Sequence, residues 1–271
     1  MKSWSMQDWA RKSVFVVVAL CATSQAVEAQ TKERVAAARK MAADEARSIE
    51  LSIGKKAEEK CELLPRPLLY WTNPVNKEVY GSVYLWTHKG RPAALGSLYR
   101  FYSPKKSFSI EMQSLSEQRL LMQKEGSTVW KPSRGLRFTE LPDSSKPSST
   151  SSVRRLQVKS LAQRFVADQI QSDGLVTRLR LLSKPLFVYP KSDDIEGSLF
   201  SIGEGTNPEV LLLIEARKHE DRLRWEYAIG RLSTQGLRVT LDDTVVYQVN
   251  PCQRPLNRPE EPYSILLRIL N

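Results

Sequence analysis

Short runs of β-branched and aromatic residues, separated by turn signals, recur along most of this chain. Two such runs, residues 78 to 88 and 93 to 102, flank Lys89-Gly90-Arg91-Pro92 and predict a β-hairpin. Side chains alternate along a strand, so both faces of the first run are apolar and both need a covering layer. One face carries Val79, Val83 and Leu85, and the other carries Tyr80, Tyr84 and Trp86.

The remaining runs predict further antiparallel strands. Residues 210 to 214 form an unbroken apolar stretch, typical of a strand covered on both faces. In residues 108 to 113 apolar and polar side chains alternate, which predicts a strand with Glu111 on a solvated face. The runs of the second half are Val176 to Leu182, Leu186 to Tyr189, Leu199 to Ile202, Glu209 to Arg217, Leu223 to Leu232, Leu237 to Leu241 and Thr244 to Val249.

Two helices are expected beside these strands. Apolar residues at steps of three or four predict an amphipathic helix over residues 30–63, ended by Pro65 and Pro67. The stretch 143–152 is Ser-rich and reads as a linker, and helical spacing resumes from residue 153 to 170.

The fold class predicted from these patterns is α+β, dominated by antiparallel sheet. An antiparallel β region covers residues 64–142, and a helix plus β-sheet region covers 153–271. Residues 64–271 also fit a single domain in which the Ser-rich stretch is an insertion.

The first 29 residues have the pattern of a secretory signal peptide. Lys2, Arg11 and Lys12 precede an apolar run from Val14 to Ala22, and small residues flank Glu28 at the expected cleavage site. The run is about half of the roughly 20 residues that a membrane span needs. We therefore expect an extracytoplasmic protein without a stable membrane span after cleavage. An uncleaved N-terminal anchor is the alternative.

The chain is basic, with 41 Lys and Arg against 30 Asp and Glu, and the leader accounts for only one of the 11 net positive charges. Outside the cytoplasm this charge favours an anionic polysaccharide or an envelope protein as partner, and not nucleic acid. Solubility alone also explains it. Removal of Cys21 leaves Cys61 and Cys252, which either form a disulfide or remain two buried thiols.

No motif for a catalytic nucleophile, a phosphate loop, a cofactor or a metal ion occurs in the sequence. The stretch from Gly203 to Pro208 is rich in glycine, but it leads into a strand and not into the helix that a dinucleotide loop requires. Two carboxylates could still form a hydrolytic site, because they can come from any part of a chain.

The aromatic face of the first hairpin is the predicted ligand site. Rings on one strand face can form a flat platform on which sugar rings stack, with polar groups at the rim. The alternative is that these rings are ordinary core under the N-terminal helix. The candidate residues are Trp71, Tyr80, Tyr84 and Trp86 for the platform, and His88 and Arg91 for its rim.

Several segments carry a resemblance to known sequences: residues 66 to 74, 79 to 81, 86 to 87, 90 to 92, 205 to 217 and 225 to 228. Together they resemble a group of uncharacterised secreted proteins of planctomycete bacteria. The resemblance implies export and a shared fold, and it implies no catalytic residues.

The sequence thus predicts an exported, non-enzymatic binding protein at the cell envelope. One alternative is an extracytoplasmic hydrolase that uses a carboxylate pair, for example on polysaccharide. The other is an envelope structural protein anchored by its uncleaved N-terminus.

Overall fold

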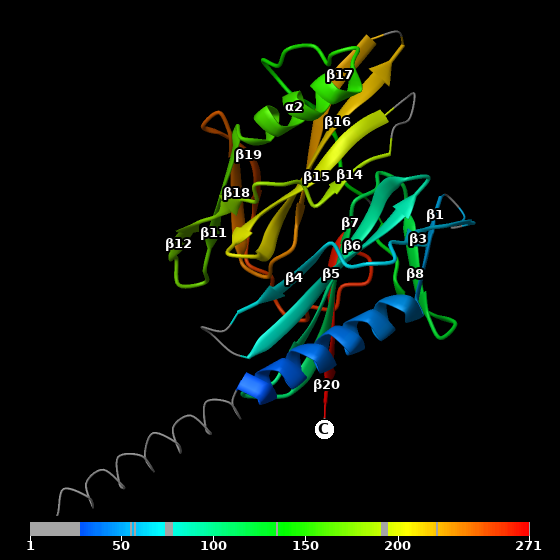
Figure 1. The fold of residues 1–271 in the computed structure, drawn as a ribbon, viewed down its shortest axis with the longest axis vertical. Coiled ribbons are helices and arrows are strands. Elements are labelled where there is room, and N and C mark those ends of the chain that lie inside the picture. Colours follow the sequence, from blue (N-terminus) through cyan, green and yellow to red (C-terminus); the bar gives the residue numbers. More distant parts are fainter. Residues whose placement is uncertain are drawn as a thin grey trace, which may run out of the picture.

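The computed structural model describes residues 28–54, 56, 58–73, 78–133, 135–190, 195–220 and 222–270. Over these residues the chain forms four antiparallel sheets and two helices, which confirms the α+β class and the dominance of antiparallel sheet (Figure 1). The predicted leader lies outside the described residues except for residues 28 and 29, which begin the first helix.

The first half begins with a helix over residues 28–48, and two sheets follow it. The smaller sheet has the order β2-β1-β8-β9, and the larger one contains β7-β6-β5-β3 with β4 beside β5. The strands are β1 (Ile49–Ile53), β2 (Glu59–Lys60), β3 (Glu62–Leu63), β4 (Leu69–Thr72), β5 (Val79–His88), β6 (Arg91–Phe101), β7 (Ser107–Ser114), β8 (Leu120–Lys124), β9 (Ser127–Trp130) and β10 (Thr139–Glu140).

The second half repeats this order element by element. Helix α2 (Ser151–Ala162) is followed by a smaller sheet, β12-β11-β18-β19, and a larger sheet containing β17-β16-β15-β13 with β14 beside β15. The strands are β11 (Phe165–Ile170), β12 (Val176–Arg178), β13 (Arg180–Leu181), β14 (Phe187–Val188), β15 (Ile195–Glu204), β16 (Asn207–His219), β17 (Arg222–Arg231), β18 (Gly236–Leu241), β19 (Thr244–Val249) and β20 (Tyr263–Ile269).

The two halves exchange their last strands. Strand β10 of the first half pairs with β17, and β20 of the second half pairs with β7, so each larger sheet is completed by the other half. The hairpins match residue by residue: both contain a bulge at the same place, between Trp86 and Thr87 in one and between Ile202 and Gly203 in the other. The chain is therefore an internal duplication with reciprocal strand exchange.

The duplicated elements pack in layers around three apolar cores. In each half the helix and the smaller sheet cover the outer face of the larger sheet and enclose one apolar core. The inner faces of the two larger sheets pack on each other and form a third core, in which Val83 and Leu95 of one half meet Leu199 and Leu211 of the other. In Figure 1 the second half lies above the first, with α2 and the N-terminal helix at opposite ends.

Both predicted helices are shorter than expected, and strands replace their C-terminal parts. The helix expected over 30–63 ends at residue 48, and Ile49, Leu51 and Ile53 then alternate with more exposed neighbours as strand β1. The helix expected over 153–170 ends at Ala162, and β11 begins at Phe165. Each strand begins and ends with a β-branched or aromatic residue, Ile49 and Ile53 in β1 and Phe165 and Ile170 in β11, which favours a strand.

The possible disulfide is not present, because Cys61 and Cys252 are both free thiols. Cys61 lies between β2 and β3, whereas Cys252 follows β19 in the other half. Burial raises the pKa of the Cys61 thiol to about 12, so this side chain behaves as a small apolar residue.

The Ser-rich stretch lies against α2. Its Ser148 amide donates to Gln157 Oε1 at 2.9 Å, and Arg154 donates back to the Ser148 carbonyl at 2.6 Å. Neither helix, over the residues that the structure describes, has the length and apolar character needed to cross a membrane.

Candidate binding cleft

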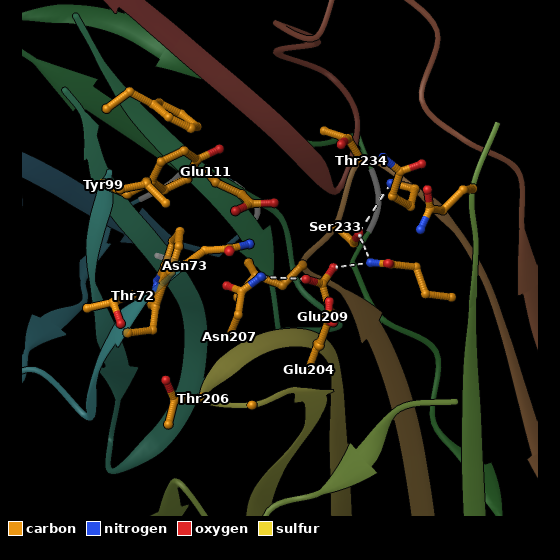
Figure 2. Close-up of a pocket in the computed structure, with 18 residues that line it drawn as sticks. Thr72, Asn73, Tyr99, Glu111, Glu204, Thr206, Asn207, Glu209, Ser233 and Thr234 are labelled. Atoms are coloured by element: carbon orange, nitrogen blue, oxygen red, sulfur yellow. Dashed lines mark hydrogen bonds between the residues drawn. The ribbon is translucent and has the colours of Figure 1, made fainter. Parts of the chain in front are cut away.

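A cleft of about 650 Å³ opens between the two larger sheets, at one end of their shared core. The first half contributes β4, the start of β5, β6 and β7, and the second half contributes the β15–β16 hairpin, the end of β11 and residues 232–235. Figure 2 shows its lining, with Glu111 and Glu209 reaching toward the same space from strands of different halves.

Glu111 lies on β7, whose predicted solvated face is in fact buried. All eight residues of β7 are buried, because β20 pairs with seven of them and the second half covers the polar face. The Tyr263 hydroxyl donates a hydrogen bond to Glu111. Burial raises the pKa of Glu111 to about 7, although the hydrogen bond from Tyr263 and the charge of Arg231 favour ionisation.

Glu209 is the second buried carboxyl of the cleft. Gln169 donates to it at 2.9 Å, and the Asn207 amide donates to its other oxygen. Burial raises the pKa of Glu209 to about 8, and the charge of Glu111 adds to this increase. The two carboxyls are therefore electrostatically coupled across the cleft.

The β15–β16 hairpin forms one rim of the cleft. A bulge at Gly203 shifts the register so that Glu204 pairs with Asn207 across a turn in which Gly205 has φ +59°. A Cβ atom on Gly203 would lie 1.9 Å from the Asn207 carbonyl oxygen, so glycine is required there. The bulge thus places the Asn207 amide beside Glu209.

Three aromatic rings form the wall on the first half. The Trp71 and Tyr99 rings lie 5.3 Å apart, and the Tyr99 and Phe101 rings lie 5.5 Å apart. The Trp71 indole fits above Gly81, where a Cβ atom would come within 2.2 Å of the ring, and its Nε1 donates to Ser97 at 3.0 Å. Trp71 is thus held rigidly against β5 and β6.

The lining of the cleft is acidic in an otherwise basic protein. Glu111, Glu204 and Glu209 line it, and none of the described lining residues is Lys, Arg or His. Its remaining polar groups are amides and hydroxyls, from Thr72, Asn73, Gln169, Gln171, Thr206, Asn207, Ser233, Thr234 and Gln235.

Because of the duplication, a position equivalent to the cleft lies between the β5–β6 hairpin and β16. Ion pairs fill this position. The register of the hairpins matches Asn207 with Arg91, and Tyr99 with Glu215. Arg91 donates to both oxygens of Glu215, at 2.9 and 3.0 Å. The Arg91 and Arg217 guanidinium groups stack on the Phe138 ring, at 4.9 and 3.9 Å from its centre.

The two buried carboxyls of the cleft have alanine counterparts. In the matching register Glu209 corresponds to Ala93 and Glu111 to Ala228. The fold is thus built a second time in the same chain without either carboxyl.

The predicted aromatic platform does not form. Tyr84 and Trp86 are buried in the outer core of the first half, in contact with the N-terminal helix and the smaller sheet. This is the alternative that the sequence left open, and it follows because both faces of β5 are covered. Only Trp71 of the six candidates lines the cleft.

The other three candidates are separated from one another. The Tyr80 ring packs edge-on against Tyr102 at 5.9 Å. His88 pairs with Glu59 at 2.9 Å, and Arg91 is held by Glu215. The second histidine of the sequence, His219, contacts Glu226.

Sequence reasoning missed Glu111 and Glu209 as site residues. The available signal was weak: each is a single carboxylate within a strand rich in apolar residues. Over the described part of the chain, no group of three or more His, Cys, Asp or Glu side chains could hold a metal ion.

Comparison with known proteins does not indicate a function, so any functional proposal depends on the geometry of the cleft. No protein-family model matches the chain, and no curated protein or solved structure matches it either.

Proposed function

We propose that this chain is an exported binding protein whose cleft holds a neutral, hydroxyl-rich ligand of the saccharide class. The observation that carries the proposal is the pair of buried carboxyls, Glu111 and Glu209, whose counterparts in the duplicated half are alanines. Support for export comes from the predicted leader over residues 1–29.

The carboxyls make the fold less stable at neutral pH, so structure alone gives no reason to keep them. Burial raises both pKa values, which means that ionising either group inside the protein costs free energy. Ala93 and Ala228 show that the same strands pack without them. A ligand that bonds to these groups supplies the reason for their presence.

The chemistry of the lining defines the ligand class. Amides and hydroxyls both donate and accept hydrogen bonds, as the hydroxyl groups of a sugar do. The rings of Tyr99 and Phe101 offer the apolar surface on which a sugar ring can pack. Three glutamates without a basic partner in the lining disfavour an anion, so the cleft suits a neutral saccharide better than an acidic one.

Isothermal titration with matched oligosaccharides tests this proposal. We expect neutral oligosaccharides to bind in the cleft, and uronic-acid oligomers of the same length to bind at least tenfold more weakly. Asn207→Ala should weaken binding, whereas Asn257→Ala, on an exposed residue outside the cleft, should not. Equal affinity of the Asn207→Ala variant and the wild type would contradict the proposed site.

Hydrolysis of a glycosidic bond is the second candidate function, and the coupling between the two carboxyls favours it. With pKa values of about 7 for Glu111 and about 8 for Glu209, neutral pH leaves Glu209 mostly protonated and Glu111 partly ionised. A glycosidase needs one carboxyl as the acid that protonates the leaving oxygen and one carboxylate as base or nucleophile. Glu209 would be the acid and Glu111 its partner.

One variant separates binding from hydrolysis. Glu209→Gln keeps a hydrogen-bonding amide in place but cannot deliver a proton. If the protein only binds, this variant retains affinity and neither protein releases reducing sugar. If it hydrolyses, the wild type releases reducing sugar and the variant loses at least a hundredfold of that rate while still binding.

A further inference from the structure

A second cavity, of about 920 Å³, lies on the other side of the Glu111–Tyr263 hydrogen bond from the binding cleft. It exists because the exchanged strands differ in length. Strand β20 pairs with seven residues of β7, whereas β10 pairs only with Tyr227 and Glu226 of β17. The rest of that strand edge, from Ala228 to Arg231, therefore faces the cavity.

The lining of this cavity is positively charged. Four arginines line it, Arg119, Arg137, Arg231 and Arg258, against the two glutamates Glu117 and Glu261. The charge of Glu117 is already offset, because it pairs with Arg217 and with Arg91.

The four arginines fall into two kinds. Arg231 donates to the backbone carbonyls of residues 233, 235 and 250, and Arg258 to those of residues 253 and 255, so both are fixed in place without a carboxylate partner. Arg119 and Arg137 are exposed at the opening, and among the described residues no side chain pairs with either guanidinium. Two fixed and two unpaired positive charges thus converge on one space.

Much of the remaining lining is apolar or aromatic, and Gln113, Ser133 and Thr139 add uncharged polar groups. Ile229, Val246 and Val249 contribute aliphatic surface, and three tyrosines contribute rings. Tyr227 and Tyr247 have no hydrogen-bond partner for their hydroxyls within the described chain, so both hydroxyls are available to a ligand. Burial raises the pKa of each, which keeps both hydroxyls protonated as donors.

We propose that this cavity is a second binding site, for a small organic anion: a carboxylate or phosphate group carried on an apolar or aromatic body. Arginine side chains recognise carboxylates and phosphates by bidentate hydrogen bonds, and the partly enclosed setting strengthens the attraction. The aliphatic and tyrosine surface holds the apolar body. Part of the chain's basic charge would then serve this site, which is separate from the acidic cleft.

Calorimetric titration with 2-naphthoate, 2-naphthyl phosphate and the neutral 2-naphthamide tests the proposal on the full mature protein. We expect saturable binding of at least one anion, tenfold or more tighter than that of the amide and weaker at higher salt. The carboxylate and phosphate arms show which group the site prefers. The combined Arg119→Gln and Arg137→Gln variant should lose at least tenfold in affinity, because it removes the two unpaired positive charges. The variant should still fold, because both side chains are exposed and neither supports the fold.

One control variant and one further test variant complete the experiment. Arg155→Gln combined with Arg180→Gln removes the same net charge from exposed positions outside the cavity and should leave binding unchanged. Tyr247→Phe keeps the ring, removes only the hydroxyl and should weaken binding. Equal binding of 2-naphthamide and 2-naphthoate, no saturable binding of either anion, or an unchanged affinity after loss of Arg119 and Arg137 would each overturn the proposal.

Discussion

Replacing Glu209 by glutamine should make the protein more resistant to alkaline pH. The pKa of Glu209 is raised from 4.5 to about 8 in the folded protein, so between these values the folded state binds more protons than the unfolded state. Stability therefore falls as pH rises through this window, and the loss is complete above about pH 8. A neutral glutamine removes this dependence while keeping the size of the side chain.

The magnitude follows from the same values. Each pKa unit corresponds to 1.36 kcal/mol, so the rise from 4.5 to about 8 corresponds to a loss of about 5 kcal/mol at most. Glu111, whose pKa rises from 4.5 to about 7, adds up to about 3 kcal/mol by the same arithmetic. The two contributions are not additive, because the charge of Glu111 is itself one cause of the increase at Glu209.

The assay is urea unfolding at constant ionic strength, followed by tryptophan fluorescence, at pH values from 5 to 9. We expect the free energy of unfolding of the wild type to fall by about 3–5 kcal/mol more than that of Glu209→Gln over this range. Glu204→Gln is the matched control, because Glu204 lies at the rim of the same cleft but is exposed. If Glu209→Gln and wild type show parallel pH profiles, the buried carboxyl is not the source of the pH dependence.

Three further predictions follow from the packing. Gly81→Ala should displace the Trp71 indole and destabilise the protein by about 1–3 kcal/mol in urea unfolding; an unchanged midpoint would contradict the observed contact. Arg217→Gln should cost about 1.5–3 kcal/mol because it removes charged hydrogen bonds to the buried Glu215 and Glu226 carboxylates, whereas Arg224→Gln, in an exposed pair, should cost less than about 1 kcal/mol. The Cys61 thiol should react with iodoacetamide at pH 8 far more slowly than free cysteine, and mass spectrometry should find no disulfide.

Local patterns in the sequence were sufficient to predict much of the sheet. Alternation along residues 79 to 88 predicted two apolar faces, and the structure confirms that Val83 and Trp86 enter two different cores. The unbroken run from 210 to 214 predicted a strand covered on both sides, and β16 is covered in that way. These features depend only on neighbouring residues, which is why alternation reveals them.

Local patterns failed where a strand from the other half decides the environment. Glu111 alternates with apolar neighbours as in any half-solvated strand, and its burial depends on β20, about 150 residues later in the chain. The helix boundaries were predicted wrongly for another reason. Ile49 and Ile53 lie four residues apart, so they fit a helical stripe as well as one face of a strand.

The duplication leaves a short trace in the sequence that a segment-by-segment reading missed. Residues 63 to 69, LLPRPLL, match residues 181 to 187, LLSKPLF, and the matched glycines Gly81 and Gly197 both pack closely against a ring. Most other matched positions carry different side chains. Conserved backbone geometry with divergent side chains has a functional consequence. One hairpin tip carries Asn207 and faces an open acidic cleft, whereas the matched tip carries Arg91 and closes its own position through Glu215.

This asymmetry separates the contacts that stabilise the fold from the proposed binding site. The closed position contributes buried ion pairs and an arginine stack on Phe138 that fix the two larger sheets against each other. The exchanged strands β10 and β20 add backbone pairing between the halves, so neither half can separate without breaking a sheet. The open position can therefore hold Glu111 and Glu209 in an unfavourable environment, because the rest of the interface maintains the geometry of the proposed binding site.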